Sequence, residues 1–448
     1  MYPYNFILAS NLIHSFLWVM LIDISHKISK IRLKNAKFAK SSFVKSWGRM
    51  NFCDDEWKYG NIYNMVKKIL SILTVLTAFA LNSSAQIRFA YDLDFDFRFD
   101  NREYDRSGFQ NSQTLFGARL APSLGFKASL DNTTHQLMAG VDALSQFGTS
   151  DKEIRCNLMF WYQLGMKFSS TEFKLSAGLL PRSFSKGEWS NLFFSDWHKF
   201  YDNRFEGLIL SWERPKSYFE LGCDWIGMAN GLRREEFMVF ASGRVTPLKW
   251  LKIGYDVYML HYACSDVVKQ VNDNILAEPY VHFDLAPFTG LQELSLRGGW
   301  IQTLQRDRAN IGHSIAPYAG ELVATVQHWG AGVRNRFVIG RNLLPYRHHV
   351  DAAGVPYDGN FYLGDPFYEL VDPRWDAWKD VADGKTSQIQ GGLYDRLEIY
   401  YAPKICAGVH LRASLFFHFH SRQYSGTNQM VSLLFNLGEL MEAVRAKK

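Results

Sequence analysis

The stretch that decides the fold is Ile87–Phe99, which reads IRFAYDLDFDFRF. Every odd-numbered residue in it is apolar, and the positions between them carry two arginines and three aspartates. Because side chains of a β-strand point alternately to opposite faces, the segment has one apolar and one charged face. A strand of a soluble sheet usually has about five or six residues. Thirteen alternating residues instead predict a strand that crosses a membrane, for which about 9–11 are needed.

The same alternation recurs along the chain. It is strong in Ile154–Phe168 and Val409–His420 and weaker in Leu251–Met259 and Met430–Leu437. Sixteen candidate strands start near residues 87, 113, 134, 154, 172, 206, 217, 235, 249, 276, 292, 320, 332, 391, 407 and 429. An even number of strands is typical of single-chain bacterial membrane barrels.

The connections between these strands alternate in length, as in outer-membrane barrels. The short ones are Asp131–Thr133, Ser169–Thr171, Pro215–Lys216, Thr246–Leu248, Pro287–Leu291, Gly330–Ala331 and Pro403–Cys406. Most of the others are longer, and Pro181–Phe205 and Leu343–Gln390 are very long. The sequence therefore predicts an all-β fold, a transmembrane antiparallel β-barrel of about sixteen strands with short periplasmic turns and long extracellular loops. Pro122 falls inside the second strand, where we expect a bulge because proline cannot donate to the ladder.

Composition excludes two other classes of protein. The 448 residues are 47% hydrophobic and 15% aromatic, which excludes intrinsic disorder. No uncharged run after residue 85 approaches the roughly 20 residues of a membrane helix, so a polytopic helical membrane protein is excluded. The net charge of +6 arises in the first 85 residues, which hold 11 basic and four acidic residues and leave 39 basic and 40 acidic residues after them. The charge therefore gives no reason to expect nucleic acid as a partner.

The leader predicts export. MVKK at Met65 precedes thirteen uncharged residues, Ile69–Leu81, and the small residues Ser83 and Ala85 mark a cleavage point before Gln86. We interpret residues 65–85 as a signal peptide and residues 1–64 as an upstream or non-native extension. The alternative is a genuine N-terminal anchor over residues 6–22 with a basic flank. We expect a barrel over residues 86–438, a periplasmic tail over 439–448, and a location in the outer membrane.

In this arrangement, residues 86–448 resemble the Gram-negative outer-membrane porins. In that family the third long loop commonly folds into the barrel as a constriction. The third long connection here is Pro181–Phe205, whose many aromatic side chains need something to pack against. The resemblance implies that this loop lies in the lumen, with Glu188, Asp196 and Lys199 as charged constriction residues. The chain departs from the family at its end, where it continues past Phe435 instead of stopping on an aromatic strand residue.

Charged residues are predicted to line the lumen. Sixteen strands enclose a space too wide for side chains to fill, so inward residues should be polar. The candidate pore-lining residues are the acidic group Asp92, Asp94 and Asp96 and the basic group Arg334, Arg336, Arg396 and Arg412. One interpretation is a field across the pore with a modest anion preference. The other is a solvated wall of paired charges.

Other chemistry receives little support from the sequence. His410, His418 and His420 share a strand face, but no cysteine or carboxylate at a matching spacing accompanies them, so we expect no metal and no cofactor. Ser414 and His410 would be about 13 Å apart along a strand, too far for a catalytic hydrogen bond, so we expect no enzyme. Cys156, Cys223, Cys264 and Cys406 fall on non-adjacent strands or opposite rims, and we expect all four to be free thiols.

The function predicted from these features is a channel for passive or weakly selective diffusion of small hydrophilic solutes. Two alternatives remain at this point, a surface glycan-binding or adhesion barrel that uses the aromatic loop Leu343–Gln390, and an outer-membrane hydrolase. The expected partners are outer-membrane lipid and lipopolysaccharide, the solutes themselves, the barrel assembly machinery and a second copy in a homo-oligomer.

Overall fold

A computed structural model describes residues 86–104, 112–148, 154–229, 234–265, 271–308, 314–341, 343, 363–368, 370 and 391–446. The chain divides into two units, residues 1–82 and 83–448, and every described residue belongs to the second. The predicted extension, the signal peptide and most of the loop Leu343–Gln390 lie outside the described residues. Within the described ranges, no helix is long and apolar enough to span a membrane.

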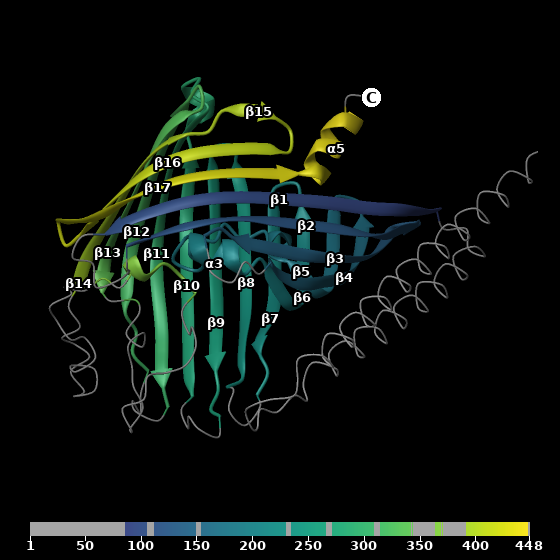
Figure 1. The fold of residues 1–448 in the computed structure, drawn as a ribbon, viewed down its shortest axis with the longest axis horizontal. Coiled ribbons are helices and arrows are strands. Elements are labelled where there is room, and N and C mark those ends of the chain that lie inside the picture. Colours follow the sequence, from purple (N-terminus) through teal and green to yellow (C-terminus); the bar gives the residue numbers. More distant parts are fainter. Residues whose placement is uncertain are drawn as a thin grey trace, which may run out of the picture. The chain divides into compact units, whose positions relative to one another are not determined.

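Strands make up most of the described part of the chain (Figure 1). They are β1 (Gln86–Tyr104), β2 (Gln113–Leu130), β3 (Thr133–Gln146), β4 (Ile154–Phe168), β5 (Thr171–Pro181), β6 (Arg204–Arg214), β7 (Ser217–Gly227), β8 (Glu236–Leu248), β9 (Leu251–Tyr262), β10 (Asn272–Asp284), β11 (Glu293–Asp307), β12 (Tyr318–His328), β13 (Ala331–Arg341), β14 (Gly391–Tyr401), β15 (Lys404–Cys406), β16 (Val409–His420) and β17 (Gln423–Asn436). The helices are η1 (Arg182–Phe184), α3 (Asp196–Tyr201), η2 (Ala286–Phe288), η3 (Pro366–Tyr368) and α5 (Leu437–Ala446).

The strands form one closed antiparallel barrel. Each long strand pairs with its neighbours in the chain, and β1 pairs with both β2 and β17, which closes the ring. β15 has three residues and lies in the connection between β14 and β16, so the wall consists of sixteen long strands among the described residues. The predicted transmembrane β-barrel of about sixteen strands is confirmed.

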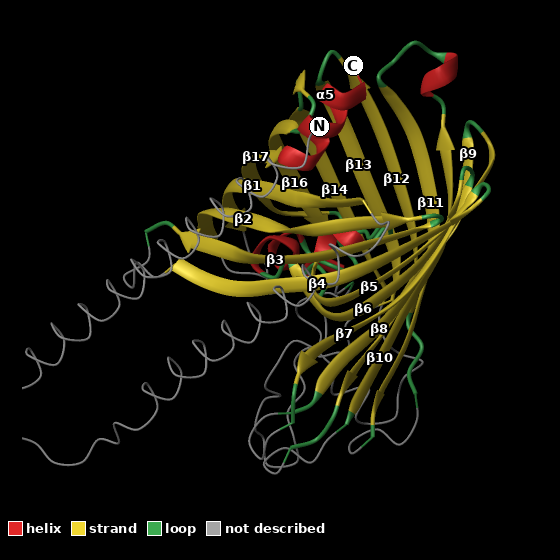
Figure 2. Ribbon diagram, turned by 90° about the vertical axis from the view of Figure 1, so that its right-hand side faces the viewer, coloured by secondary structure: helices red, strands yellow, loops and turns green. Residues whose placement is uncertain are grey.

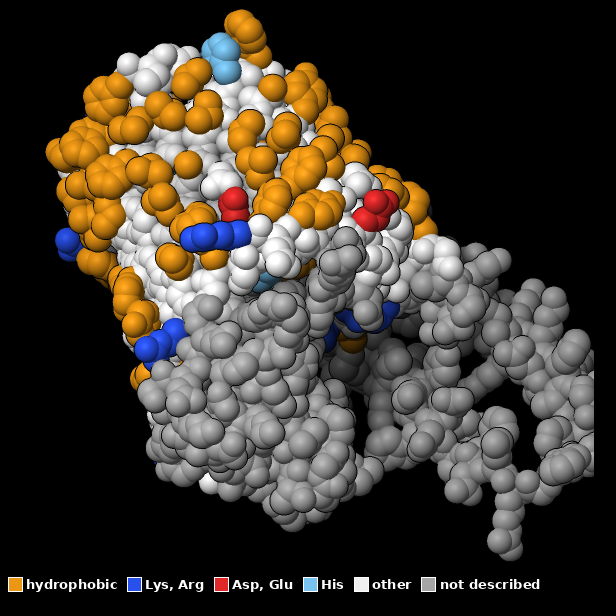
Figure 3. All heavy atoms as spheres, turned by 90° about the vertical axis from the view of Figure 1, so that its left-hand side faces the viewer, with side chains coloured by type: hydrophobic (Ala, Val, Ile, Leu, Met, Phe, Trp, Pro, Cys, Tyr) orange, Lys and Arg blue, Asp and Glu red, His pale blue; other side chains and the backbone are white. Residues whose placement is uncertain are grey.

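The two faces of the wall differ as the alternation predicts. On β1 the inward residues Asp96, Asp100 and Arg102 are at most 7% exposed, whereas the outward Phe89 and Tyr91 are 59% and 52% exposed. Apolar side chains cover much of the outer surface in Figure 3, with few charged side chains among them. This apolar exterior is the surface that a membrane barrel presents to lipid.

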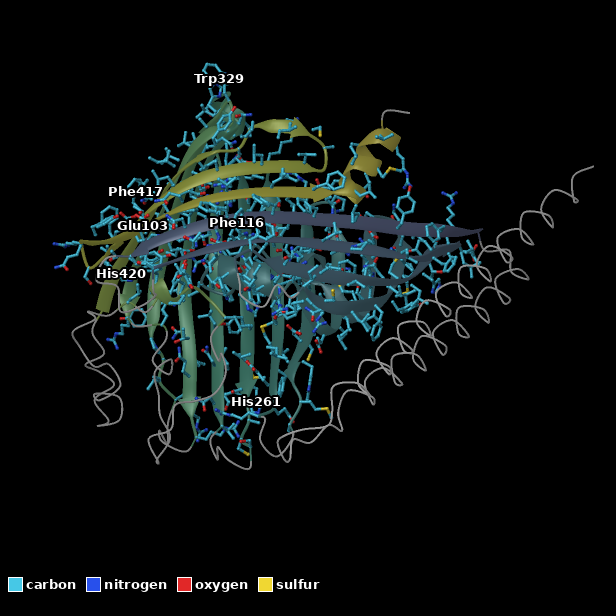
Figure 4. The ribbon with its side chains drawn as sticks, in the orientation of Figure 1. Glu103, Phe116, His261, Trp329, Phe417 and His420 are labelled. Atoms are coloured by element: carbon cyan, nitrogen blue, oxygen red, sulfur yellow. The ribbon has the colours of Figure 1, made fainter. Side chains whose placement is uncertain are left out.

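The two ends of the barrel carry different connections. Trp329 and Gly330 form a tight turn with φ of 51° and 83°, the left-handed geometry of a two-residue hairpin. Figure 4 places Trp329 at one end of the barrel and His261, at the end of β9, at the opposite end, from which the long connections leave. The long connection that concerns function is the one between β5 and β6, because it turns into the barrel.

The structure tests three local expectations. The bulge expected at Pro122 is wrong, because the registers of β2 with β1 and with β3 are the same on both sides of it. The last strand begins at Gln423 instead of near residue 429. Its first five residues lack the alternation of apolar and polar side chains on which the expected start depended. The four cysteines within the described residues are free, as expected.

Candidate functional site

The connection between β5 and β6 lies inside the barrel. Leu192, Phe193 and Phe194 are at most 1% exposed and belong to the main apolar cluster. The Phe193 ring meets the Tyr258 ring of β9 with centroids 5.4 Å apart. These side chains leave water by packing on the inner wall, which favours insertion of the segment. Figure 2 shows a helix within the ring of strands, where α3 of this connection lies.

Glu220 on β7 holds the first part of this connection. Its carboxylate accepts hydrogen bonds from the Ser185 hydroxyl at 2.6 Å, the Lys186 amide at 2.7 Å and the Gly187 amide at 3.0 Å. The hydroxyl of Ser242 on β8 donates to the same carboxylate at 2.8 Å. The Glu220 side chain is fully buried, so the loop amides and hydroxyls supply the hydrogen bonds that water would otherwise give.

Asp196, at the start of α3, contacts the opposite wall. Its carboxylate lies 3.1 Å from the Arg396 guanidinium of β14, and its carbonyl accepts a hydrogen bond from Arg98 of β1 at 2.6 Å. Arg98 also stacks 4.8 Å from the centre of the Phe200 ring. The connection therefore crosses the lumen, from Glu220 on one side to β1 and β14 on the other.

A second segment, Leu363–Tyr368, joins the first in the lumen. The Ser195 amide donates to the Leu363 carbonyl at 2.9 Å, so the two segments are linked through their backbones. Phe367 stacks on His418 with ring centroids 4.5 Å apart, and the Tyr368 hydroxyl donates to Glu321 at 2.8 Å. Phe367 and Tyr368 belong to the aromatic loop Leu343–Gln390, for which glycan binding was the alternative; these two side chains are buried in the main apolar cluster.

A small pocket remains between α3 and the wall. It is lined by Arg98, Asp100, Arg102, Leu115, Asp196, Trp197, Phe200 and Tyr201. Trp197 and Tyr201 lie with ring centroids 3.9 Å apart, and Arg102 forms a 2.7 Å ion pair with Asp100. The pocket thus offers aromatic faces beside charges of both signs.

Each predicted pore-lining charge has a hydrogen-bonding partner or an ion-pair partner, and four of the seven, Asp96, Arg336, Arg396 and Arg412, are in ion pairs. Asp96 bonds Arg119 at 3.2 Å, Asp92 accepts from the Gly438 amide at 3.0 Å, and Asp94 accepts from the Asn436 amide group. The arginine contacts are Arg412 with Glu398 at 2.7 Å, Arg336 with Glu321 at 3.4 Å, Arg396 with Asp196, and Arg334 with the Thr325 hydroxyl at 3.3 Å. The interpretation as a wall of paired charges fits these contacts better than a field across the pore.

The three predicted constriction residues all lie on the inserted connection. Glu188 pairs with Arg244 of β8, and the Lys199 ammonium donates to the Trp189 carbonyl at 3.2 Å. Burial raises the pKa of Asp196, but Arg396, Lys199 and Arg98 outweigh this effect and hold it below its ordinary value. Burial lowers the pKa of Lys199 to about 8, against the opposing effect of Asp196. Of the predicted residues, Asp196 and Arg396 form an ion pair, and Arg336 and Arg396 are partners across β13 and β14.

We expect His198 to make the inserted connection sensitive to acid. Burial, assisted by Arg182, lowers the pKa of His198 to about 3, so the inserted imidazole is neutral at neutral pH. In a released loop His198 would bind a proton near its ordinary pKa of about 6.5. The free energy of insertion therefore becomes less favourable as pH falls from about 6.5 toward 3, by about 1.4 kcal/mol per pH unit.

Because a weakly held connection leaves the lumen more often, we expect a higher conductance at pH 4.5 than at pH 7. His198→Phe keeps the stacking on Phe194 and should abolish most of this change; an unaltered pH response in that variant would contradict the assignment.

Sequence analysis missed Arg297 on β11, which connects three buried acids. It bonds Glu278 at 2.5 Å and Glu321 at 3.0 Å, and it lies 3.9 Å from Asp256. All three acidic side chains have no exposed surface. The inward positions of these residues follow from strand alternation, but their mutual contacts depend on the stagger between four strands, which the sequence does not state.

A polar cluster on the outer face was also missed. The imidazole of His135 on β3 lies 2.8 Å from the Tyr162 hydroxyl of β4 and 3.3 Å from the Thr133 hydroxyl. Thr133, His135 and Tyr162 lie on the lipid-facing side of the wall, near the end with short turns. The Thr133 hydroxyl donates its hydrogen bond to the Leu130 carbonyl at 2.9 Å, so it must turn toward His135 before the imidazole can activate it as a nucleophile. Within the described residues, no group of three or more His, Cys, Asp or Glu is placed to hold a metal ion.

Comparison with known proteins gives two kinds of match. The model of the lipid A 3'-O-deacylase-type family matches residues 82–272, less than half of the chain. Similar solved structures include a loop-deletion mutant of OmpT, an outer membrane protein of Vibrio cholerae (10% identity, TM-score 0.46, 79% of this chain and all of that one). A Rhodopseudomonas blastica porin mutant (10%, 0.41, 78% and 100%) and Pseudomonas aeruginosa OpdL (10%, 0.39, 78% and 98%) are also similar. No curated protein matches.

These matches concern two expectations. Outer-membrane porins are among the similar solved structures, as the resemblance of the sequence implied; the fold itself is established by the strand pairing of this chain. The expectation that the protein is not an enzyme is overturned by the match to a deacylase-type family. The sequence argument compared only His410 and Ser414, both of which lie outside the matched residues 82–272.

Proposed function

We propose that this protein is an outer-membrane channel whose lumen is narrowed by its own inserted segments, and which admits small hydrophilic solutes with weak charge selectivity. The observation that carries this proposal is the connection Pro181–Phe205, which contacts the wall at Glu220 on one side and at Arg98 and Arg396 on the other. A segment attached to both sides of the lumen narrows the pore, as constrictions do in channels.

Weak selectivity follows from the paired charges. Ion pairs such as Arg412 with Glu398 and Asp96 with Arg119 present little net charge to a passing ion. Lipid contacts the apolar exterior, and solutes meet the pocket beside Trp197 and Tyr201.

The test is a recording from the purified barrel in a planar bilayer. We expect small, discrete conductance steps and a reversal potential close to zero in a salt gradient. Absence of steps from a correctly folded barrel would contradict the channel, and a strongly anion- or cation-selective reversal potential would contradict the paired wall.

The second candidate is an acyl hydrolase that acts on lipid in contact with the lipid-facing side of the barrel wall. It is favoured by the cluster of Thr133, His135 and Tyr162, which lies within the residues matched by the deacylase-type family model. In this proposal the Thr133 hydroxyl attacks an ester carbonyl while His135 accepts its proton. His135 then returns the proton to the departing alcohol, and water hydrolyses the acyl–enzyme ester. Tyr162 orients the imidazole.

Mass spectrometry of membrane phospholipids tests this second candidate, because the cluster lies near the short turns, which face the periplasm in such barrels, beside the inner leaflet. Cells that express the native chain should contain phospholipid lacking one ester-linked acyl chain, and His135→Ala should abolish the loss. His261→Ala is the matched control, because His261 is also outward and also hydrogen-bonded, to Asp273 at 2.7 Å, but has no hydroxyl in this arrangement. Equal phospholipid profiles for His135→Ala and the native chain would exclude the assignment.

A further inference from the structure

Asn335 and Asp395 form a polar pair on the outer, lipid-facing side of the wall. The Asn335 amide donates to the Asp395 carboxylate at 2.7 Å. Their strand neighbours Arg336 and Arg396 point inward, toward Glu321 and Asp196. Because side chains alternate along a strand, Asn335 and Asp395 therefore point outward.

The surroundings of this pair are apolar on every side. Asp395 lies between Leu393 and Leu397 on its own strand. Across the ladder it faces Phe337 of β13 and Phe419 of β16. Asn335 faces Ala324 of β12 on its other side. By contrast, outward polar residues such as Asp273 and Glu103 lie at strand ends, where lipid headgroups and water are within reach.

A carboxylate in this position is costly if it faces acyl chains. An ionisable residue at membrane depth requires partners, and those that remain usually mark a functional contact. An asparagine side chain has two N–H donors and one carbonyl, and a carboxylate has two acceptor oxygens. The bond between Asn335 and Asp395 uses one donor and one acceptor oxygen, and leaves capacity for further hydrogen bonds directed outward.

We propose that the outer face of β13 and β14 around Asn335 and Asp395 is a contact surface with a second copy of this chain. The pair contains both a donor and an acceptor, so it is complementary to itself when a copy is turned about a two-fold axis. Such self-complementarity is what an isologous interface requires. The amide of each copy meets the carboxylate of the other, and the surrounding apolar residues Phe337 and Leu397 pack against their counterparts.

Cross-linking in membranes tests the proposal. In a chain whose cysteines are all replaced by serine, Phe337→Cys should form a dimer with a short bifunctional thiol reagent. Leu175→Cys is the control, because Leu175 points outward on β5, on the opposite side of the ring. This variant should form no cross-linked dimer. Adding Asp395→Leu to Phe337→Cys should lower the cross-linked fraction about tenfold, equivalent to about 1.4 kcal/mol. If Phe337→Cys fails to fold, Ile339→Cys on the same face of β13 replaces it.

Native mass spectrometry provides an independent measurement without introduced cysteines. We expect a dimer for the native barrel in mild detergent and a monomer for Asp395→Leu. Resistance to unheated SDS should show that both barrels are still folded. A monomeric native barrel with no cross-link at residue 337 would overturn the proposal. So would equal cross-linking with and without Asp395→Leu, or a product that contains a different protein.

Discussion

Replacing Glu220 with alanine should release the inserted connection and raise the single-channel conductance several-fold. The side chain is buried and accepts hydrogen bonds from three consecutive loop residues, Ser185, Lys186 and Gly187, within 3.0 Å. A hydrogen bond to a charged group contributes about 1.5–3 kcal/mol, so losing the carboxylate removes much of what holds the loop on this wall. Trypsin should then cleave the loop at Lys186 and Lys199 faster than in the native barrel.

Glu213→Gln is the matched control for this experiment. Glu213 also contacts the connection, through Lys186 at 2.6 Å, but this ion pair is 23–37% exposed and contributes at most about 1 kcal/mol. The control should conduct as the native barrel does. A folded Glu220→Ala barrel with unchanged conductance and unchanged tryptic cleavage would show that the loop is held by other contacts.

Replacing Arg297 with methionine should give the largest loss of stability. The change leaves Glu278, Glu321 and Asp256 without their shared cation, and none of these side chains has contact with bulk water. Removing one partner of a buried ion pair costs about 3–5 kcal/mol. We therefore expect the temperature at which the barrel unfolds in SDS to fall markedly.

The control for this prediction is Arg308→Met. Arg308 pairs with Asp273 at 2.8 Å, but it is 53% exposed, so its loss should have little effect. Arg297→Met combined with Glu278→Gln should recover part of the lost stability, because one buried charge is removed. Equal unfolding temperatures for Arg297→Met and the native barrel would show that the buried acids do not depend on this arginine.

The strands were predictable because their signal is local. The alternation in Ile87–Phe99 assigns each residue to a face without reference to any other strand, and the observed faces of Phe89 and Asp96 agree. The inward course of Pro181–Phe205 followed from the porin resemblance together with its aromatic side chains, which cannot remain in water.

The contacts that hold the site together were not predictable in the same way. Glu220 and Arg297 appear in the sequence as ordinary inward polar residues. Their importance arises because strand stagger and the path of the loop bring distant groups against them. The second inserted segment escaped prediction for a related reason: an aromatic loop suits external binding as well as internal packing, and only the position of His418 and Tyr394 beside Phe367 favours the interior.

The most direct test of the constricted channel is the conductance of the barrel with and without the middle of its inserted connection. Deleting Glu188–Lys199 removes Asp196 and the buried residues Leu192–Phe194 but none of the wall. The account predicts a folded barrel with larger conductance steps and a reduced response to pH, since His198 is also lost. A folded deletion variant with the conductance of the native barrel would place the narrowest point elsewhere and contradict the account.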